Sequence, residues 1–494
     1  MNHFIGIDQG TTMTTALVVD DVGAIVGQAS APLAQHYPQP GWVEHDANEI
    51  LELTVQVLQE AIADAGLAAT DITAIGIANQ RETLTFWDKN TGEPSAPAIV
   101  WQDRRTLPLC EELIAEDGEG ILDHTGSAIV PNAAGTKIAW QLENNDEIRR
   151  GVEEGRLVCG TVDSWLAWKL TGGAVHATDR SNASVTLLMD ARTREYSPRM
   201  LERMGIPESI LPALVDTAGY LGHTNATLTG AAIPLTALAG DQTAAALGQG
   251  CIETGMVKNT YGTGSFLVLN VGSEYVSPTT GVMAPVLWTM PDKVDYGLEG
   301  YADASGAAVQ WLRESLGLGS ADEVEALAAT VVDNGGVYFV PSFAGLGSPH
   351  FDSYARGTIL GLTRGSTPGH IARAAYEAMA HQVCDALQEI QRTSGTQAKV
   401  IRADGGGAHS NLLMQLQADL LGIPVERPVV TETTAYGAAL LAGVGAGAIQ
   451  GLQAASDRWA LDHRFEPQLA EDERRKQRAR WQKAIEHARG WLRD

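Results

Sequence analysis

The sequence predicts an α/β protein built from two similar, doubly wound domains with a cleft between them. Its 494 residues are enough for two domains. Strand-like and helix-like segments alternate along both halves, which is typical of such sheets. One device, a strand, a tight Gly/Thr turn and a second strand, occurs at 4–19 and again at 257–269. We therefore expect a duplicated core, with domains at 1–249 and 250–494.

The repeated turn has the composition that a bound phosphate requires. Residues 10–12 in the first copy and 262–264 in the second are glycine and threonine. They offer backbone N–H groups and hydroxyls without side-chain bulk. One such turn alone is more often an ordinary hairpin. Two of them suggest a nucleotide phosphate chain held between the domains.

The elements of the first half follow from apolar patterning. Helical spacing of apolar residues predicts a helix over 48–64. Apolar runs predict a strand at 72–78 and another at 84–87 as its neighbour in the sheet. The remaining segments are a strand at 157–161, a helix at 162–170, a strand at 235–239 and an alanine-rich helix at 243–248.

The second half continues the alternation after its own copy of the turn. Strands are expected at 337–340 and 400–403. Helices are expected at 306–316, 368–392, 411–421 and 471–493. The alternating charges of the last helix indicate a solvated face.

Composition excludes several classes of protein. A net charge of −26 without a basic patch argues against a nucleic-acid partner. A hydrophobic fraction of 44% argues against disorder, and no apolar run has the length of a membrane span. Four widely spaced cysteines predict free thiols in a reducing compartment. The chain enters a strand at its start, which leaves no room for a signal peptide, so we expect a cytoplasmic protein without a membrane partner.

Two aspartates stand at predicted strand ends. Asp8 lies beside the first turn, where a carboxylate can hold Mg²⁺ through water while the turn holds phosphate oxygens. Asp241 ends a strand and precedes a helix, shortly before the second turn. Alone it is more often a helix N-cap. Near a phosphate turn it fits a general base that orients an acceptor hydroxyl.

Other segments suggest where an acceptor and a nucleotide would lie. Arg81 and Glu82 place a fork of donors next to an acceptor, which suits vicinal hydroxyls, and Trp101 could wall such a site. A surface ion pair and plain core packing are the alternatives. Residues 404–407, Asp-Gly-Gly-Gly, would let the backbone approach a flat ligand. The sequence lacks the Rossmann GxGxxG pattern at this point and the P-loop GxxxxGK[ST] pattern.

Together these residues resemble the FGGY carbohydrate kinases, and among them the members that phosphorylate glycerol. The resemblance covers nearly the whole chain. Its specific stretches are residues 8–12, 40–46, 79–83, 160–166, 239–242, 258–264 and 357–365.

The resemblance implies the actin/hexokinase-like (ribonuclease H-like) fold and transfer of a phosphoryl group from ATP–Mg²⁺ to a polyol hydroxyl. Domain 1–249 would bind the polyol and domain 250–494 the nucleotide. The implied acceptor residues are Arg81, Glu82, Trp101, Asn132, Asp241, Gln242 and Phe266. The implied nucleotide residues are Thr11, Thr12, Met13, Thr263, Gly306, Gln310, Gly406 and Ser410. Asp241 would be the base, and Asp8 with Asp241 would lie at the metal. A homodimer, the family's habit, stays open.

The chain departs from the family pattern near the acceptor. Where the family has Pro-Tyr-Phe-Ser-Gly-Thr-Lys, residues 131–137 replace the tyrosine by Asn132 and the serine by Ala134. Residues 301–305, Tyr-Ala-Asp-Ala-Ser, replace a mostly apolar stretch and introduce Asp303. These changes suggest an acceptor larger than glycerol, such as a four-carbon polyol. In the alternative, Tyr301 or another ring refills the space and glycerol stays the acceptor.

The nucleotide side departs as well. Residues 13–15 are Met-Thr-Thr, where the family usually has Ser-Ser-Arg, and Ser410 replaces a usual asparagine. The first change removes a positive charge near the phosphates.

Several functions remain in competition. We expect the ATP-dependent phosphorylation of a primary hydroxyl of glycerol, giving sn-glycerol 3-phosphate and ADP. The alternatives are a kinase of erythritol, threitol, xylulose or ribulose, a non-catalytic sensor on the same fold, and an actin- or chaperone-like ATPase. The presence of both Asp8 and Asp241 argues against the non-catalytic sensor. The hydroxyl-binding residues expected at 79–82 have no evident use in an ATPase without a small acceptor.

Overall fold

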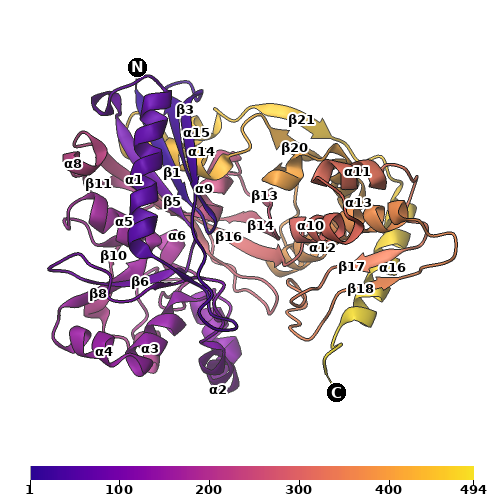
Figure 1. The fold of residues 1–494 in the computed structure, drawn as a ribbon, viewed down its shortest axis with the longest axis horizontal. Coiled ribbons are helices and arrows are strands. Elements are labelled where there is room, and N and C mark those ends of the chain that lie inside the picture. Colours follow the sequence, from indigo (N-terminus) through magenta and orange to yellow (C-terminus); the bar gives the residue numbers. More distant parts are fainter. Residues whose placement is uncertain (1, 494) are drawn as a thin grey trace.

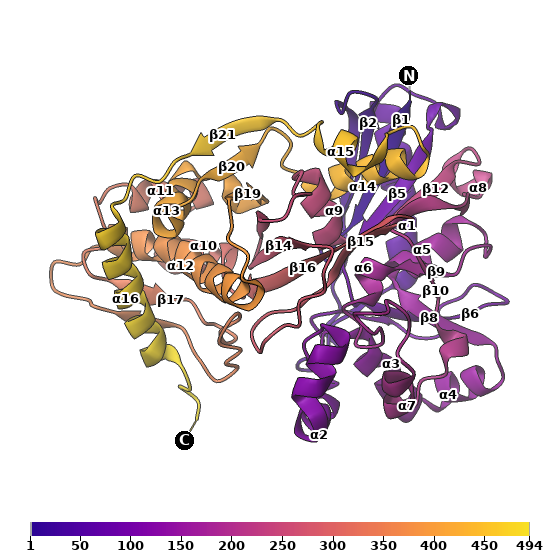
Figure 2. The same ribbon diagram turned by 180° about the vertical axis from the view of Figure 1, so that it is seen from behind.

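The computed structural model describes residues 2–493 and divides into two α/β halves, each organised around a large mixed sheet (Figures 1 and 2). The first sheet has the strand order β11-β12-β5-β1-β2-β3, and the second has the order β15-β16-β14-β13-β19-β20-β21. The first is formed by β1 (His3–Gln9), β2 (Met13–Asp20), β3 (Ile25–Pro32), β5 (Ala74–Asn79), β11 (Ala218–His223) and β12 (Pro234–Gly240). The second is formed by β13 (Met256–Tyr261), β14 (Ser265–Gly272), β15 (Val286–Met290), β16 (Lys293–Ala302), β19 (Val400–Asp404), β20 (Val425–Pro428) and β21 (Leu461–Phe465).

The two sheets repeat one topology. In the first, β1 pairs antiparallel with β2 and parallel with β5, and β5 continues in parallel to β12. In the second, β13 pairs antiparallel with β14 and parallel with β19, and β19 continues in parallel to β20. An antiparallel edge strand follows in both, β11 in one and β21 in the other. The duplicated core predicted from the repeated turn is therefore confirmed.

Helices flank both sheets. Those of the first half are α1 (Ala47–Asp64), α2 (Leu107–Thr125), α3 (Ala134–Asn144), α4 (Asp146–Glu153), α5 (Val162–Leu170), α6 (Arg180–Ala183), α7 (Pro198–Met204), α8 (Ala226–Thr229) and α9 (Asp241–Gly248). Those of the second half are α10 (Gly306–Leu316), α11 (Ala321–Ala328), α12 (Pro368–Ser394), α13 (Asn411–Leu421), α14 (Thr433–Gly445), α15 (Gly451–Ser456) and α16 (Glu471–Ala488). The predicted helices are confirmed, although α16 ends before residue 493 and buries one face through Trp481 and Ile485.

One strand pairing was predicted wrongly. The strand at 84–87 is β6 (Leu84–Asp88), and it is not a neighbour of β5. It belongs to a four-stranded sheet with β4 (Glu44–His45), β7 (Ala98–Ile99) and β8 (Leu157–Thr161). Between β5 and β6 the backbone turns through Glu82, whose φ of 68° is left-handed. Strand propensity does not reveal such a turn, so adjacency in sequence was mistaken for adjacency in the sheet.

Two short sheets complete the fold. One pairs β9 (Ala177–Asp179) with β10 (Ala213–Val215), and the other pairs β17 (Tyr338–Val340) with β18 (Thr358–Leu360). Within residues 2–493, no helix combines the length and the hydropathy of a membrane span.

Helix α14 belongs to the second half of the chain but lies against the first sheet and α9 (Figure 2). Glycines allow this approach. A Cβ on Gly6 would lie 1.9 Å from the carbonyl oxygen of Ala435, and one on Gly76 would lie 2.2 Å from that of Ala438. A Cβ on Gly248, at the end of α9, would lie 2.0 Å from the carbonyl oxygen of Thr433. Since α9 begins at Asp241, this packing fixes the helix that carries the predicted base.

Candidate active site

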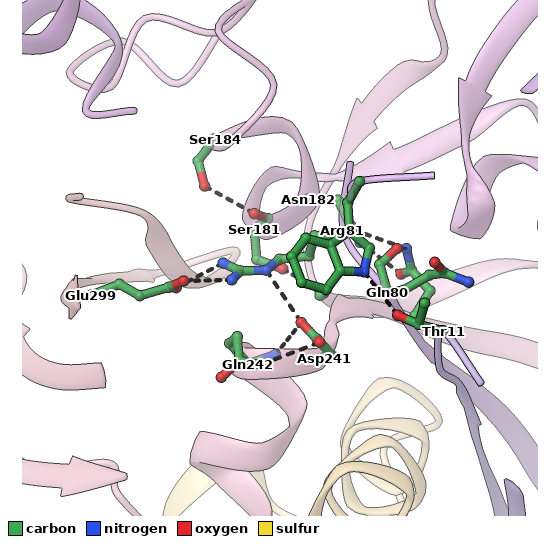
Figure 3. A network of polar contacts seen from close by, with 12 residues as sticks. Thr11, Gln80, Arg81, Ser181, Asn182, Ser184, Asp241, Gln242 and Glu299 are labelled. Carbon is green, nitrogen blue, oxygen red and sulfur yellow. Dashed lines mark hydrogen bonds and ion pairs between the residues drawn. The ribbon is translucent and has the colours of Figure 1, made fainter. Parts of the chain in front are cut away.

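The site begins where three parallel strands of the first sheet end. Asp8 in β1 lies opposite Ala78 of β5, and Gly240 of β12 lies opposite Asn79. Arg81 is the second residue after the end of β5, and Asp241 directly follows β12. Because the carboxyl ends of parallel strands meet at one edge of a sheet, these side chains come together there. Figure 3 shows Arg81 and Asp241 side by side, with Gln242 next to them.

Arg81 is the centre of an ion-pair network that crosses from the first domain to the second. Its Nη1 and Nη2 donate to Glu299 of β16 at 2.8 and 2.6 Å, and its Nε lies 3.2 Å from Oδ1 of Asp241 (Figure 3). Burial alone would lower the pKa of the guanidinium, but Glu299 and Asp241 outweigh burial and raise it. A bidentate pair of this kind fixes the plane of the guanidinium.

Asp241 is the first residue of α9, not its N-cap, which is Gly240. Its Oδ1 accepts a hydrogen bond from the backbone N–H of Gln242 at 2.7 Å, and its Oδ2 accepts one from Gln242 Nε2 at 3.2 Å. The side-chain oxygen of Gln242 accepts from the buried Lys258. The side chain of Asp241 is 31% exposed, so a ligand can still reach it.

Glu82 is buried in a strained backbone conformation. It is 8% exposed, and its φ of 68° is unusual for a residue other than glycine. Burial raises the pKa of its carboxyl to about 7. The buried Lys137 donates to the carbonyl oxygen of Glu82 at 2.8 Å and to that of Asn132 at 2.5 Å. Lys137 therefore ties two of the predicted acceptor residues together.

Trp101 connects the first turn with the second domain. Its Nε1 donates to Oγ1 of Thr11 at 2.8 Å. Its ring meets Phe266 edge-on, with 6.4 Å between ring centroids. Phe266 lies in β14, directly beyond the second turn. The contact between Trp101 and Phe266 thus joins predicted acceptor residues of the two domains.

Four carboxylates surround the ends of the central strands. The pKa of Asp8 is raised well above its usual value by burial and then by the charges of Asp241, Glu432 and Asp404. Among the described residues, no three His, Cys, Asp or Glu side chains are grouped closely enough to bind a metal ion directly.

The second turn sits on the start of α10. The carbonyl oxygen of Thr263 accepts from the N–H groups of Ser305 and Ala307 at 2.8 and 3.1 Å, and that of Gly262 accepts from Gly306 at 3.0 Å. A Cβ on Gly306 would lie 2.7 Å from the oxygen of Gly262, so this glycine is required by packing. A Cβ on Gly406 would meet no atom within 4 Å, which leaves open space beside it.

The other predicted nucleotide residues differ in their surroundings. Thr12 and Met13 are exposed at the first turn. Gln310 is exposed and donates to Glu314 at 2.9 Å within its own helix. The hydroxyl of Ser410 caps α13 by accepting from Leu413 N at 3.0 Å. The side chains of Gln310 and Ser410 are thus engaged inside their own helices.

Sequence reasoning missed several residues at the site. Glu299 in β16 and Lys258 in β13 are buried, and a buried charge needs a partner. A charged residue among strand-forming residues was the available signal. Glu432 gave no such signal, because it lies between β20 and α14. Buried polar atoms of Asn259, Thr260, Ser265, Ser305 and Asp404, around the second turn, lack a hydrogen-bond partner within residues 2–493.

The family models for the two domains of FGGY carbohydrate kinases match this chain in order. The N-terminal domain matches residues 3–248 and the C-terminal domain residues 257–446. The chain belongs to the FGGY family of carbohydrate kinases.

Individual FGGY proteins are similar over the whole length. A glycerol kinase of Deinococcus radiodurans is 47% identical, with 99% of this chain and 98% of that protein covered. Glycerol kinase 2 of Thermotoga maritima is 46% identical, with 99% of each covered. The structure of Plasmodium falciparum glycerol kinase with ADP superposes with a TM-score of 0.93 at 32% identity, covering 99% of this chain and 98% of that one. The recognition of the family and the two-domain fold are thereby confirmed.

Proposed function

We propose that this FGGY kinase transfers the γ-phosphoryl group of ATP to a primary hydroxyl of glycerol, giving sn-glycerol 3-phosphate and ADP. The observation that carries the proposal is the position of Asp241. Its carboxylate is held against Arg81 and Gln242 at the meeting point of the two domains and remains partly exposed. The full-length similarity to glycerol kinases supports glycerol as the acceptor.

Each acceptor residue has a role that follows from its chemistry. Arg81 donates to vicinal hydroxyls, and Glu82 accepts from them. Asp241 accepts the proton of the attacking hydroxyl and, above all, orients it. Phosphoryl transfer has a loose transition state, so positioning contributes more than deprotonation. Trp101 and Phe266 pack against the carbon–hydrogen faces of the polyol.

The nucleotide lies on the other side of this meeting point. The two turns, at Thr11 and Thr263, present N–H groups and hydroxyls to the phosphates. The open space beside Gly406 suits the flat base. Domain 1–249 then carries the acceptor and the base, and domain 250–494 carries most of the nucleotide contacts.

A Mg²⁺ ion fits the carboxylates at the strand ends. The raised pKa of Asp8 reflects burial and uncompensated negative charge, which a cation would relieve. Asp8 and Asp241 would hold the ion through water. The ion would neutralise charge on the phosphates.

Two further proposals concern the cellular location and the assembly of the protein. Four buried free cysteines suit a reducing compartment, so we place the reaction in the cytoplasm. A homodimer stays a prediction.

An acceptor panel tests the proposal. ADP release would be followed with purified protein, ATP and Mg²⁺ over glycerol, erythritol, threitol, xylulose and ribulose. We expect the highest kcat/KM with glycerol. A strong preference for a tetritol or a ketose over glycerol would overturn the choice of acceptor. ADP release that is independent of any acceptor would point to an ATPase instead.

A further inference from the structure

The side of the acceptor site formed by residues 131–134 carries no aromatic ring. Where FGGY kinases of this type have a tyrosine, the chain has Asn132. The side-chain oxygen of Asn132 accepts from Nη1 of Arg104 at 3.2 Å, and its backbone oxygen accepts from Lys137. The neighbouring Ala133 and Ala134 are buried methyl groups. This segment therefore supplies an amide and two methyl groups in place of a ring.

An aromatic ring reaches the same region from the second domain. Tyr301 of β16 lies directly opposite Phe266 of β14 in the antiparallel register. The two rings stack at 6.0 Å between centroids with 20° between their planes. Since Phe266 also contacts Trp101, the three rings form a continuous row from the first domain into the second. Phe351 closes the far end of the row, edge-on to Tyr301 at 5.4 Å.

The hydroxyl of Tyr301 is carried by a ring that stacks on Phe266, one of the predicted acceptor residues. Burial raises its pKa, and the charges of Asp303, Arg104, Glu82 and Glu299 act on it. Arg104 holds Asn132, and Glu82 is a predicted acceptor residue. No hydrogen bond of this hydroxyl is found within residues 2–493, although the side chain is half-buried. The hydroxyl is therefore available to a ligand.

The backbone around Tyr301 fixes the direction of its side chain. Its N–H donates to Oγ of Ser348 at 3.1 Å, and its carbonyl oxygen accepts from Ser348 N at 2.8 Å. A Cβ on Gly347 would lie 3.0 Å from Cε2 of the Tyr301 ring, so the ring rests on a bare glycine. A ring held by packing on one side and stacking on the other is preorganised, which lowers the entropic cost of binding.

We propose that Tyr301 is a specificity-determining residue that forms the aromatic wall of the acceptor site and limits the acceptor to three carbons. The inference rests on the proposed function. The ring takes the place of the missing tyrosine from the opposite domain, and its hydroxyl hydrogen-bonds the acceptor hydroxyl remote from the reacting one. Burial raises the pKa of the neighbouring Asp303, and the charge of Arg104 offsets this effect only in part.

Four variants test the proposal by steady-state kinetics with glycerol and erythritol. In Tyr301→Ala we expect the KM for glycerol to rise about tenfold with kcat within about threefold, because a ring contact and a hydrogen bond are lost. Erythritol turnover should increase in the same variant. Tyr301→Phe keeps the ring and should raise the KM about threefold. Asn132→Tyr combined with Tyr301→Ala should restore the KM, because the ring returns on the other side.

Tyr354→Ala is the matched control, since Tyr354 is an exposed tyrosine in the segment after Phe351 and contacts Arg493. Its kinetics should equal those of the wild type. An unchanged KM and selectivity in both Tyr301 variants would overturn the inference. If Tyr301→Ala does not fold, as judged by ATP binding, the KM of Tyr301→Phe decides. A wild-type preference for erythritol over glycerol would instead overturn the proposed function.

Discussion

Replacing Glu299 by glutamine probes the contact that joins the two domains at the site. Glu299 is 1% exposed at its side chain and receives two hydrogen bonds from Arg81. The amide of Glu299→Gln keeps one acceptor but turns an NH₂ group toward the guanidinium. Charge-assisted hydrogen bonds contribute about 1.5–3 kcal/mol, and an uncompensated buried charge costs at least as much. We therefore expect the substitution to weaken the interactions that hold Arg81 in place by about 2–3 kcal/mol.

This loss should fall on acceptor binding and orientation, because Arg81 also contacts Asp241 at 3.2 Å. At about 1.36 kcal/mol per tenfold, kcat/KM for glycerol should fall roughly 30- to 150-fold. The assay is the coupled measurement of ADP release, with the dissociation constant of ATP measured in parallel. Glu195→Gln is the matched control, because Glu195 pairs with Arg180 but is 64% exposed at its side chain. Exposed pairs contribute at most about 1 kcal/mol, so its kcat/KM should change less than about fivefold. A kcat/KM for Glu299→Gln within twofold of the wild type would show that the pairing of Glu299 with Arg81 does not support acceptor binding.

Three further predictions follow from other contacts. The KM for glycerol should fall as pH rises through 7, because burial raises the pKa of Glu82 to about 7 and the ionised carboxylate accepts hydrogen bonds from the hydroxyls of glycerol. A profile of the KM from pH 6 to 8 checks this prediction. The same slope of KM against pH in Glu82→Gln would contradict it. Trp101→Phe removes the hydrogen bond to Thr11 and should raise the KM for ATP or glycerol about threefold to tenfold. Unchanged KM values for both substrates would show that this hydrogen bond contributes nothing to binding. Gly76→Ala should lower the thermal midpoint by several degrees, because its Cβ would lie 2.2 Å from the oxygen of Ala438, whereas Gly219→Ala on β11, where no atom lies within 4 Å, should not.

The sequence was sufficient for the features that depend on local pattern. Apolar periodicity predicted α1, and the repeated Gly/Thr turn predicted the matching hairpins β1–β2 and β13–β14. The sequence also placed Asp8 and Asp241 at strand ends, and the parallel pairing of β1, β5 and β12 brings those ends to one edge of the sheet.

Features that depend on distant contacts were not predictable in the same way. The partner of β6 is decided by the left-handed turn at Glu82. The role of Glu299 depends on a pairing with Arg81, which lies 218 residues away in the sequence. Likewise, Tyr301 could be named as a candidate ring, but only the register of β14 with β16 places it on Phe266. Spacing along a chain carries no information about such contacts.

The proposed function requires that the site assembled around Asp241 transfers phosphoryl groups to glycerol. The most direct test follows the label of γ-³²P-ATP with wild-type protein and with Asp241→Asn, which keeps the shape of the side chain. We expect labelled glycerol 3-phosphate from the wild type, and none above background from Asp241→Asn, which should still bind ATP. Undiminished transfer by Asp241→Asn, or label appearing only as inorganic phosphate with the wild type, would contradict it.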